Sequence, residues 1–209
     1  MATEKHINYF ALEKACEKPG CPLCTIVSER SARYIDNMLF EHVSDRGFRA
    51  KFRDAGGFCP IHAKNLDSYR DGLAVAILGG DILADILPAL KKQKIVKPKA
   101  QCPACEETSR IETEFLGFVA ESTDEHFTSF FTASDGLCIP HYRHLIMTVK
   151  RIPLWLKNFQ EAKYTELLER TKTYIEFSAW GRQDDFARLT ERDKIVWKEI
   201  ALTLRGNKD

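Results

Sequence analysis

The chain has 209 residues, of which 44% are hydrophobic, and its 31 basic and 30 acidic residues leave a net charge of +1. This length and apolar content allow a sizeable core, so the chain does not need a metal merely to compensate for small size. The even charge balance gives no global field that would attract nucleic acid, an anionic membrane or an acidic substrate. We therefore expect no membrane or nucleic-acid partner, whereas a protein partner and the oligomeric state stay open.

The N-terminal residues contain no apolar run like that of a signal peptide, and no stretch of about 18 apolar residues occurs in the chain. We therefore expect a cytoplasmic protein. Seven cysteines are present, and four of them form two Cys-x-x-Cys pairs. An odd count with this spacing favours free or metal-bound thiolates over disulfides.

The first half of the chain predicts a helical hairpin. Apolar residues recur at helical spacing from Ile7 to Cys16 and again from Cys24 to about Phe40. One helix from Cys24 to Cys59 would separate its ends by about 50 Å, so the chain must turn back. We place the corner at residues 43–45, with Ser44 as an N-cap, and a return helix before Gly56 and Gly57.

Two short motifs predict helix starts that carry metal ligands. In the first, Cys21 is an N-cap residue, Pro22 the first helical residue and Cys24 the third. In the second, Cys59 is an N-cap residue and His62 the third helical residue. The positive ends of two helices would favour thiolate over thiol. We expect the hairpin to bring these four side chains, Cys21, Cys24, Cys59 and His62, around one ion.

The same unit occurs twice. Cys21 and Cys24 align with Cys102 and Cys105, 81 residues later, and Cys59 and His62 align with Cys138 and His141, 79 residues later. Core positions repeat along with these residues, so the internal repeats span 21–66 and 102–145. We predict a second site formed by Cys102, Cys105, Cys138 and His141.

Helical patterns fill the rest of the chain. Residues 73–87 predict a strongly apolar central helix, kinked or ended near Pro88, with its leucine and isoleucine side chains in the core. Five lysines between 91 and 99 predict a solvated linker. A C-terminal helical segment, 151–209, holds a long helix from Pro153 and a last helix capped at Thr190. The expected fold is one all-α domain, 1–209, built as a pseudo-twofold duplicated hairpin with two Cys3His sites at helix N-termini.

Three thiolates and one imidazole suit a closed tetrahedral zinc site, and two zinc ions are our first expectation. Two iron–sulfur clusters are the alternative, since thiolates at helix starts with one histidine would also hold them. A thiol redox pair would need a βαβ frame, which this pattern does not predict. Because protein side chains would fill every coordination position of the metal, we expect no catalytic residue. One alternative stays open: an enzyme in which the ligating histidine leaves the metal and admits another ligand.

Two further residues lie near these motifs. Cys16-x4-Cys21-x2-Cys24 has the opening spacing of plant-type ferredoxins, but the residue that corresponds to Cys16 in the second unit is Lys97. We therefore expect Cys16 to be a bystander. His144 follows His141 by three residues, and we expect it to serve as a polar group outside the ligands.

The succession of Cys-Pro-x-Cys, Gly-Phe-Cys-x-x-His, the helix Gly72–Leu78, and the repeated motifs resembles a family of uncharacterised prokaryotic proteins with a domain of unknown function. The resemblance spans nearly the whole chain, more loosely after Pro153, and it implies no activity. Cys16 departs from the family pattern. From the residues, we expect a zinc-binding scaffold or regulatory module, or else an iron–sulfur electron-transfer or redox-sensing protein.

Overall fold

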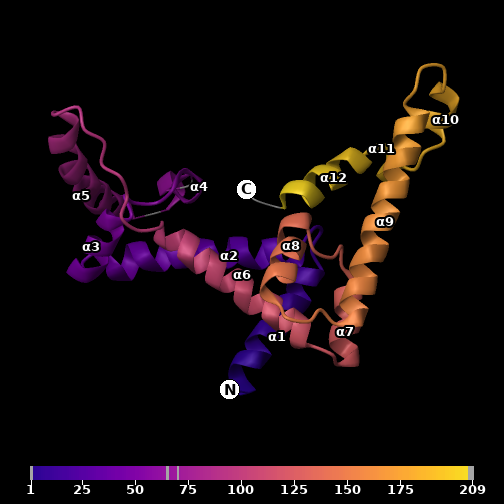
Figure 1. The fold of residues 1–209 in the computed structure, drawn as a ribbon, viewed down its shortest axis with the longest axis horizontal. Helices are drawn as coiled ribbons and strands as arrows, with labels where there is room; N and C mark the ends of the chain where they lie inside the picture. Colours follow the sequence, from indigo (N-terminus) through magenta and orange to yellow (C-terminus); the bar gives the residue numbers. More distant parts are fainter. Residues whose placement is uncertain (1, 65, 70, 207–209) are drawn as a thin grey trace. The chain divides into compact units, whose positions relative to one another are not determined.

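The computed structural model describes residues 2–64, 66–69 and 71–206, and every regular element in these ranges is a helix (Figure 1). The predicted all-α class is confirmed, whereas a twofold relation between the copies stays a prediction. The chain forms two compact units: unit 1 comprises residues 1–28 and 112–209, and unit 2 comprises residues 29–111. It leaves unit 1 within α2 (Pro22–Asn37) and returns within α6 (Pro103–Glu121).

Unit 1 has an aromatic core. Phe127 and Phe131 of α7 (Glu125–Ala133) are fully buried, and the ring of Tyr9 on α1 (Ala2–Cys16) lies 5.9 Å from that of Phe127. The first helix therefore docks on α7. The other helices of this unit are α8 (Ile139–Thr148), α9 (Leu154–Phe177), α10 (Gln183–Ala187), α11 (Glu191–Lys194) and α12 (Val196–Arg205).

The last helix, α12, is held against α8 and α9. Its Glu199 accepts a 2.6 Å hydrogen bond from Arg170 of α9, whose Nε also donates to Asp193 of α11 at 2.7 Å. The side chain of Arg170 is only 15% exposed, so this ion-pair network is partly shielded from solvent. It holds α11 and α12 against α9 within unit 1.

Unit 2 begins within α2, which continues into a π-helix, η1 (Met38–His42). The chain then forms α3 (Arg46–Asp54), α4 (Pro60–Ala63), η2 (Leu66–Ser68) and α5 (Gly72–Leu90). The corner lies where we predicted it, but Asp45 rather than Ser44 is the N-cap residue of α3. Ser31 on α2 lies 2.7 Å from Thr108 on α6, and Ile35 shares a buried cluster with Ala104. Within this unit, the end of α2 thus runs antiparallel to the start of α6.

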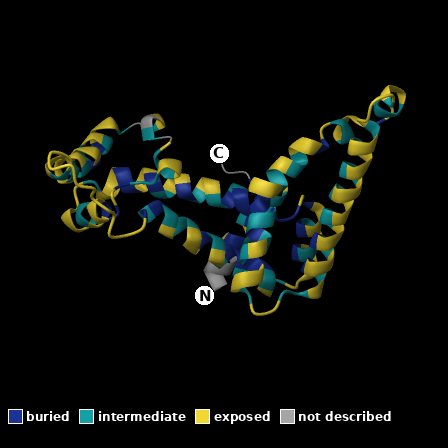
Figure 2. Cartoon of the chain, turned by 45° about the horizontal axis from the view of Figure 1, so that its top comes forward, coloured by how far each residue is buried: buried dark blue, intermediate teal, exposed yellow. Residues whose placement is uncertain are grey.

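The apolar helix α5 packs on the core along one side only, so our prediction of a central core helix was wrong for Leu83 and Leu87. Only Ala74 and Leu78 are buried, whereas Leu83 is 56% and Leu87 49% exposed; much of α5 is yellow in Figure 2. Among the described residues, α5 alone has the length and hydropathy to cross a membrane. Hydrophobicity on all sides predicted burial, but α3 and η1 cover only one side of this helix.

Candidate metal centres

Four helix starts carry the candidate ligands. Cys59 and Cys138 are the N-cap residues of α4 and α8, in extended backbone conformation, each followed by a proline within the first two helical positions. Cys21 and Cys102 directly precede α2 and α6. The carbonyl oxygen of each of these four cysteines accepts the first bond of its helix, from Thr25, Ala63, Glu106 and Tyr142. The predicted caps are therefore present, and each remaining ligand is the third residue of its helix.

Site 1 consists of Cys21, Cys24, Cys138 and His141, and all four residues are buried in unit 1. His141 Nδ1 lies 3.4 Å from Sγ of both Cys21 and Cys24, and 3.2 Å from Cys138 Sγ. The sulfurs of Cys24 and Cys138 are 3.7 Å apart.

Site 2 consists of Cys59, His62, Cys102 and Cys105 in unit 2, and only Cys102 is fully buried. His62 Nδ1 lies 3.3 Å from Cys59 Sγ, 3.4 Å from Cys105 Sγ and 3.7 Å from Cys102 Sγ. The sulfurs of Cys59 and Cys105 are 3.5 Å apart. Both sites therefore present Nδ1 of the histidine to three sulfurs.

These spacings fit one ion in each site. With zinc–sulfur bonds of about 2.3 Å, tetrahedral geometry separates two sulfurs by about 3.8 Å. All four ligand atoms of each site lie within 4.8 Å of one another, so they can share a single centre. A four-iron cluster binds each ligand through a different iron and would hold the ligands farther apart.

The ligands belong together in a different way from the one we predicted. We expected Cys21 and Cys24 to share an ion with Cys59 and His62, but they lie with Cys138 and His141. Likewise, Cys102 and Cys105 lie with Cys59 and His62. Each Cys-Pro-x-Cys motif is therefore completed by the Cys-x-x-His motif of the other repeat.

Helix lengths explain this exchange. From Pro22 to the end of η1, the chain runs for about 30 Å, whereas the nine residues of α3 return it by about 13 Å. The return helix therefore ends closer to the far end of α2 than to its start. Because the start of α6 lies beside that far end, Cys59 reaches Cys102 and Cys105 instead of Cys21. The turn lies where the sequence predicts it, but it brings Cys59 to the ligands of the other repeat.

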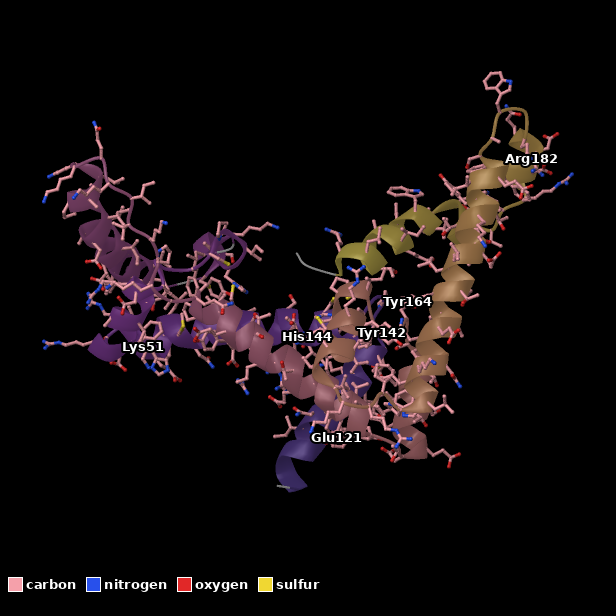
Figure 3. The ribbon with its side chains drawn as sticks, in the orientation of Figure 1. Lys51, Glu121, Tyr142, His144, Tyr164 and Arg182 are labelled. Carbon is pink, nitrogen blue, oxygen red and sulfur yellow. The ribbon has the colours of Figure 1, made fainter. Side chains whose placement is uncertain are left out.

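Each histidine also has a partner at its other ring nitrogen. Nε2 of His141 lies 3.4 Å from Oε1 of Glu112. Oε2 of Glu112 lies 3.1 Å from Nδ1 of His144, which is labelled in Figure 3. A ligating histidine commonly donates its second N–H to a carboxylate, which fixes the tautomer and the ring orientation. His144 thus acts through Glu112, outside the ligands, as we expected.

At site 2 the corresponding partners are hydroxyl groups. Nε2 of His62 lies 3.4 Å from Oγ1 of Thr108, which in turn contacts Oγ of Ser31. The sequence offset of 81 aligns Ser31 with Glu112, so the two repeats differ at this position. Our reading of the sequence missed both Glu112 and Thr108; their position on the ligand-bearing helix α6 was the available signal.

The electrostatics favour a thiolate at Cys138 and Cys59, the N-cap residues of α8 and α4, whereas burial and contacts with neighbouring cysteines raise the pKa of Cys21 and raise that of Cys105 to about 12. Hydrogen bonds from Cys21 and Cys24 lower the pKa of Cys138 to about 4. For Cys59, burial alone would raise the pKa, but the backbone N–H groups of His62 and Ile61 and contacts with the other cysteines outweigh it. The pKa of Cys59 is therefore lowered, in line with the positive end of a helix.

Cys16 belongs to neither group of ligands. It ends α1, and burial raises the pKa of its thiol to about 12, opposed by a hydrogen bond with Ser134. The expected bystander role of Cys16 agrees with this position.

The C-terminal end of α12 closes site 1. Gly206 follows the helix with φ +73° and ψ 172°, and a Cβ atom at this position would lie 2.9 Å from Cys24 Sγ and 3.3 Å from Cys138 Sγ. Only glycine adopts this backbone conformation readily. A cavity of about 500 Å³, lined by Cys21, Cys138, Arg170 and Thr203 among others, borders the same side of site 1. The sequence indicated a helix end at Gly206 but not its contact with the thiolates.

Comparison with known proteins gives relatives but no activity. The profile of a family of unknown function, DUF6062, matches residues 5–114 and thus includes all of site 2 and half of site 1. An uncharacterised 23.9 kDa protein in the xynA 3′ region of Caldicellulosiruptor sp. (strain Rt8B.4) is 27% identical over 164 residues, 73% of this chain and 80% of that protein. No solved structure matches the chain.

Proposed function

The chain belongs to this family of unknown function, and we propose that it is a scaffold or regulatory module whose two Cys3His sites each hold a structural zinc ion. The observation that carries this proposal is the set of distances within each group, with all ligand atoms within 4.8 Å of one another. Cys3His is an established zinc ligand set, and it fills every position of a tetrahedral ion. No position is left for a catalytic water.

The ions would act as cross-links. The two motifs that meet in site 1 are 114 or more positions apart in the chain, and the two that meet in site 2 are 40 or more positions apart. Closing such long loops with metal stabilises the folded chain because the unfolded chain has no preformed site. Site 1 would connect α2 to α8, and site 2 would connect α4 to α6. We therefore infer a role in shaping a protein surface rather than in chemistry.

Metal analysis with an absorption spectrum of anaerobically purified protein tests the proposal. We expect two zinc ions per chain and no visible absorption. A brown protein with iron and labile sulfide would overturn the zinc assignment and favour the iron–sulfur alternative, which would serve electron transfer or redox sensing.

Paired substitutions test which ligands share an ion. Cys21→Ala with Cys138→Ala should leave one zinc, because both changes affect site 1. Cys21→Ala with Cys59→Ala removes the same number of thiols but should leave none, because it affects both sites. If the second variant keeps one zinc and the first keeps none, each repeat binds its own ion and the observed grouping is wrong.

A further inference from the structure

Helix α5 presents a continuous apolar face to solvent. Its exposed positions recur at three and four residues, so they share one side of the helix. Its 18-residue segment of highest hydropathy averages 1.9, yet only 11% of that segment is buried. The exposed residues on this face are Leu73, Ala76, Gly80, Leu83, Ala84, Leu87 and Leu90.

The charged side chains of α5 lie on its other side. Asp81 accepts hydrogen bonds of 2.6 Å from both Nε and Nη2 of Arg49 on α3, and Arg53 lies 3.5 Å from Asp85. These ion pairs attach the helix to α3 and neutralise its two carboxylates. The hydrogen bond from Arg49 also lowers the pKa of Asp81, which keeps this carboxylate charged. No charge is therefore left on the exposed apolar face.

A basic segment follows the helix directly. Residues 91–99 contain Lys91, Lys92, Lys94, Lys97 and Lys99, and all of them are exposed. Lys99 pairs with Asp54, whereas the others add positive charge next to the apolar face. Ile95 and Val96, which lie between these lysines, are also exposed, Ile95 at 88%. Apolar and basic groups are thus combined in one stretch of chain, 73–97.

We propose that this surface, the apolar face of α5 with the lysines of residues 91–97, binds peripherally to an anionic lipid bilayer. Apolar side chains that enter the interface and lysines that meet anionic headgroups are the two components of such binding. Charge complementarity selects this partner over a second copy of the chain. Two copies that met through this face would place their lysines close to each other. The carboxylates of α5 already pair with arginines of α3, so they would not neutralise these lysines.

The helix would lie on the bilayer and not cross it. Asp81 stands in the middle of α5 and is only 17% exposed in its pair with Arg49. A crossing helix would have to leave α3 and carry two carboxylates into the hydrocarbon, which is strongly unfavourable. Our expectation of no membrane partner rested on the net charge of the whole chain, which does not describe this local surface. The proposal extends beyond the zinc scaffold and does not depend on it.

Co-sedimentation of the purified 209-residue chain with lipid vesicles tests the proposal. We expect binding to vesicles of phosphatidylglycerol and phosphatidylcholine in equal parts, and at least tenfold weaker binding to phosphatidylcholine alone. Changing Lys91, Lys92, Lys94 and Lys97 to glutamine should weaken binding about 100-fold or more, since each lysine contributes to attraction near an anionic surface. The matched control changes four exposed lysines elsewhere to glutamine, Lys14, Lys51, Lys150 and Lys157, and should retain binding.

A second pair of variants tests the apolar component. Leu83→Glu with Leu87→Glu should abolish binding, whereas Leu168→Glu with Ile175→Glu, at equally exposed positions on α9, should not. All four positions are on the surface, and unchanged metal content and circular dichroism would show that each variant folds. Three results would overturn the proposal: no binding to anionic vesicles, equal loss in the control variants, or a dimer in solution that Leu83→Glu with Leu87→Glu dissociates.

Discussion

Site 1 and site 2 use the same four donors but differ in their surroundings. All four ligands of site 1 are buried, and His141 is only 3% exposed. In site 2, Cys59, His62 and Cys105 are each partly exposed. Site 1 is covered by the end of α12 and supported by a carboxylate, whereas site 2 has hydroxyl groups beside its histidine.

This difference shows that repeated ligands do not make equivalent sites. An ion in site 1 would have buried ligands and the end of α12 around it and would border the cavity at Cys21 and Cys138, whereas an ion in site 2 would lie closer to solvent. We therefore expect a chelator to remove the two ions in separate phases, site 2 first, because local opening costs least where few groups must move. The following variants each change one of the features that distinguish the two sites.

The largest effect is expected for Gly206→Ala. The added Cβ would lie 2.9 Å from Cys24 Sγ, so either the thiolate or the chain end must move. Overpacking costs about 1–3 kcal/mol, and the backbone conformation at φ +73° adds about 1–3 kcal/mol for a non-glycine residue. The variant should lose the slow phase of metal release while it keeps the fast one.

Gly117→Ala is the matched control. This glycine lies within α6 in unit 1, and no atom lies within 4 Å of the position of an added Cβ. Alanine there should leave both phases unchanged, with a small gain in helix stability. If Gly206→Ala also behaved in this way, the end of α12 would not enclose site 1.

A smaller effect is expected for Glu112→Gln. The amide no longer carries the charge that orients His141, and loss of such a partner commonly weakens metal binding by about 10- to 100-fold. Competition with a zinc chelator at equilibrium would measure this change, which should affect site 1 alone. Thr108→Val, the corresponding change beside His62, should weaken site 2 by less, because a neutral hydroxyl is replaced. Equal effects of the two variants would mean that the two outer partners are equivalent.

Much of this comparison could be predicted from the sequence. The Cys-x-x-Cys and Cys-x-x-His spacings, with proline in the first turn, predicted the eight candidate ligands as N-cap and third helical residues, because these rules act within a few residues. The repeat also pairs six of the seven cysteines, so that Cys16 has no corresponding cysteine in the second unit. Local chemistry therefore determined what the ligands are and how each pair is presented.

The grouping of the ligands could not be predicted in the same way. It depends on the lengths of α2 and α3 and on the contact of α2 with α6, which are properties of the packed unit. The exposure of α5 was missed for a similar reason, since composition does not reveal how many neighbours a helix has. The contact of Gly206 with Cys24 joins residues 182 positions apart and leaves no local signal.

The smallest effect is expected for Arg170→Met, which weakens the attachment of α12 and so the enclosure of site 1. The hydrogen bond from Arg170 lowers the pKa of Asp193. Burial alone would raise the pKa of Glu199, but hydrogen bonds from Arg170 and Arg192 lower it, so both pairs stabilise the folded chain when the carboxylates are charged. This contribution, about 0.2–1 kcal/mol for each partly exposed pair, is present above the ordinary pKa values of 3.8 and 4.5 and is lost as pH falls through the lowered values. Hydrogen exchange of α12 amides should be faster in the variant, by nearly the same factor at pH 7 and pH 6, and the difference should shrink below about pH 4.5. Lys172→Met, which breaks an exposed pair with Glu169 on the same helix, should change nothing. A difference that vanished between pH 7 and pH 6 would contradict this assignment.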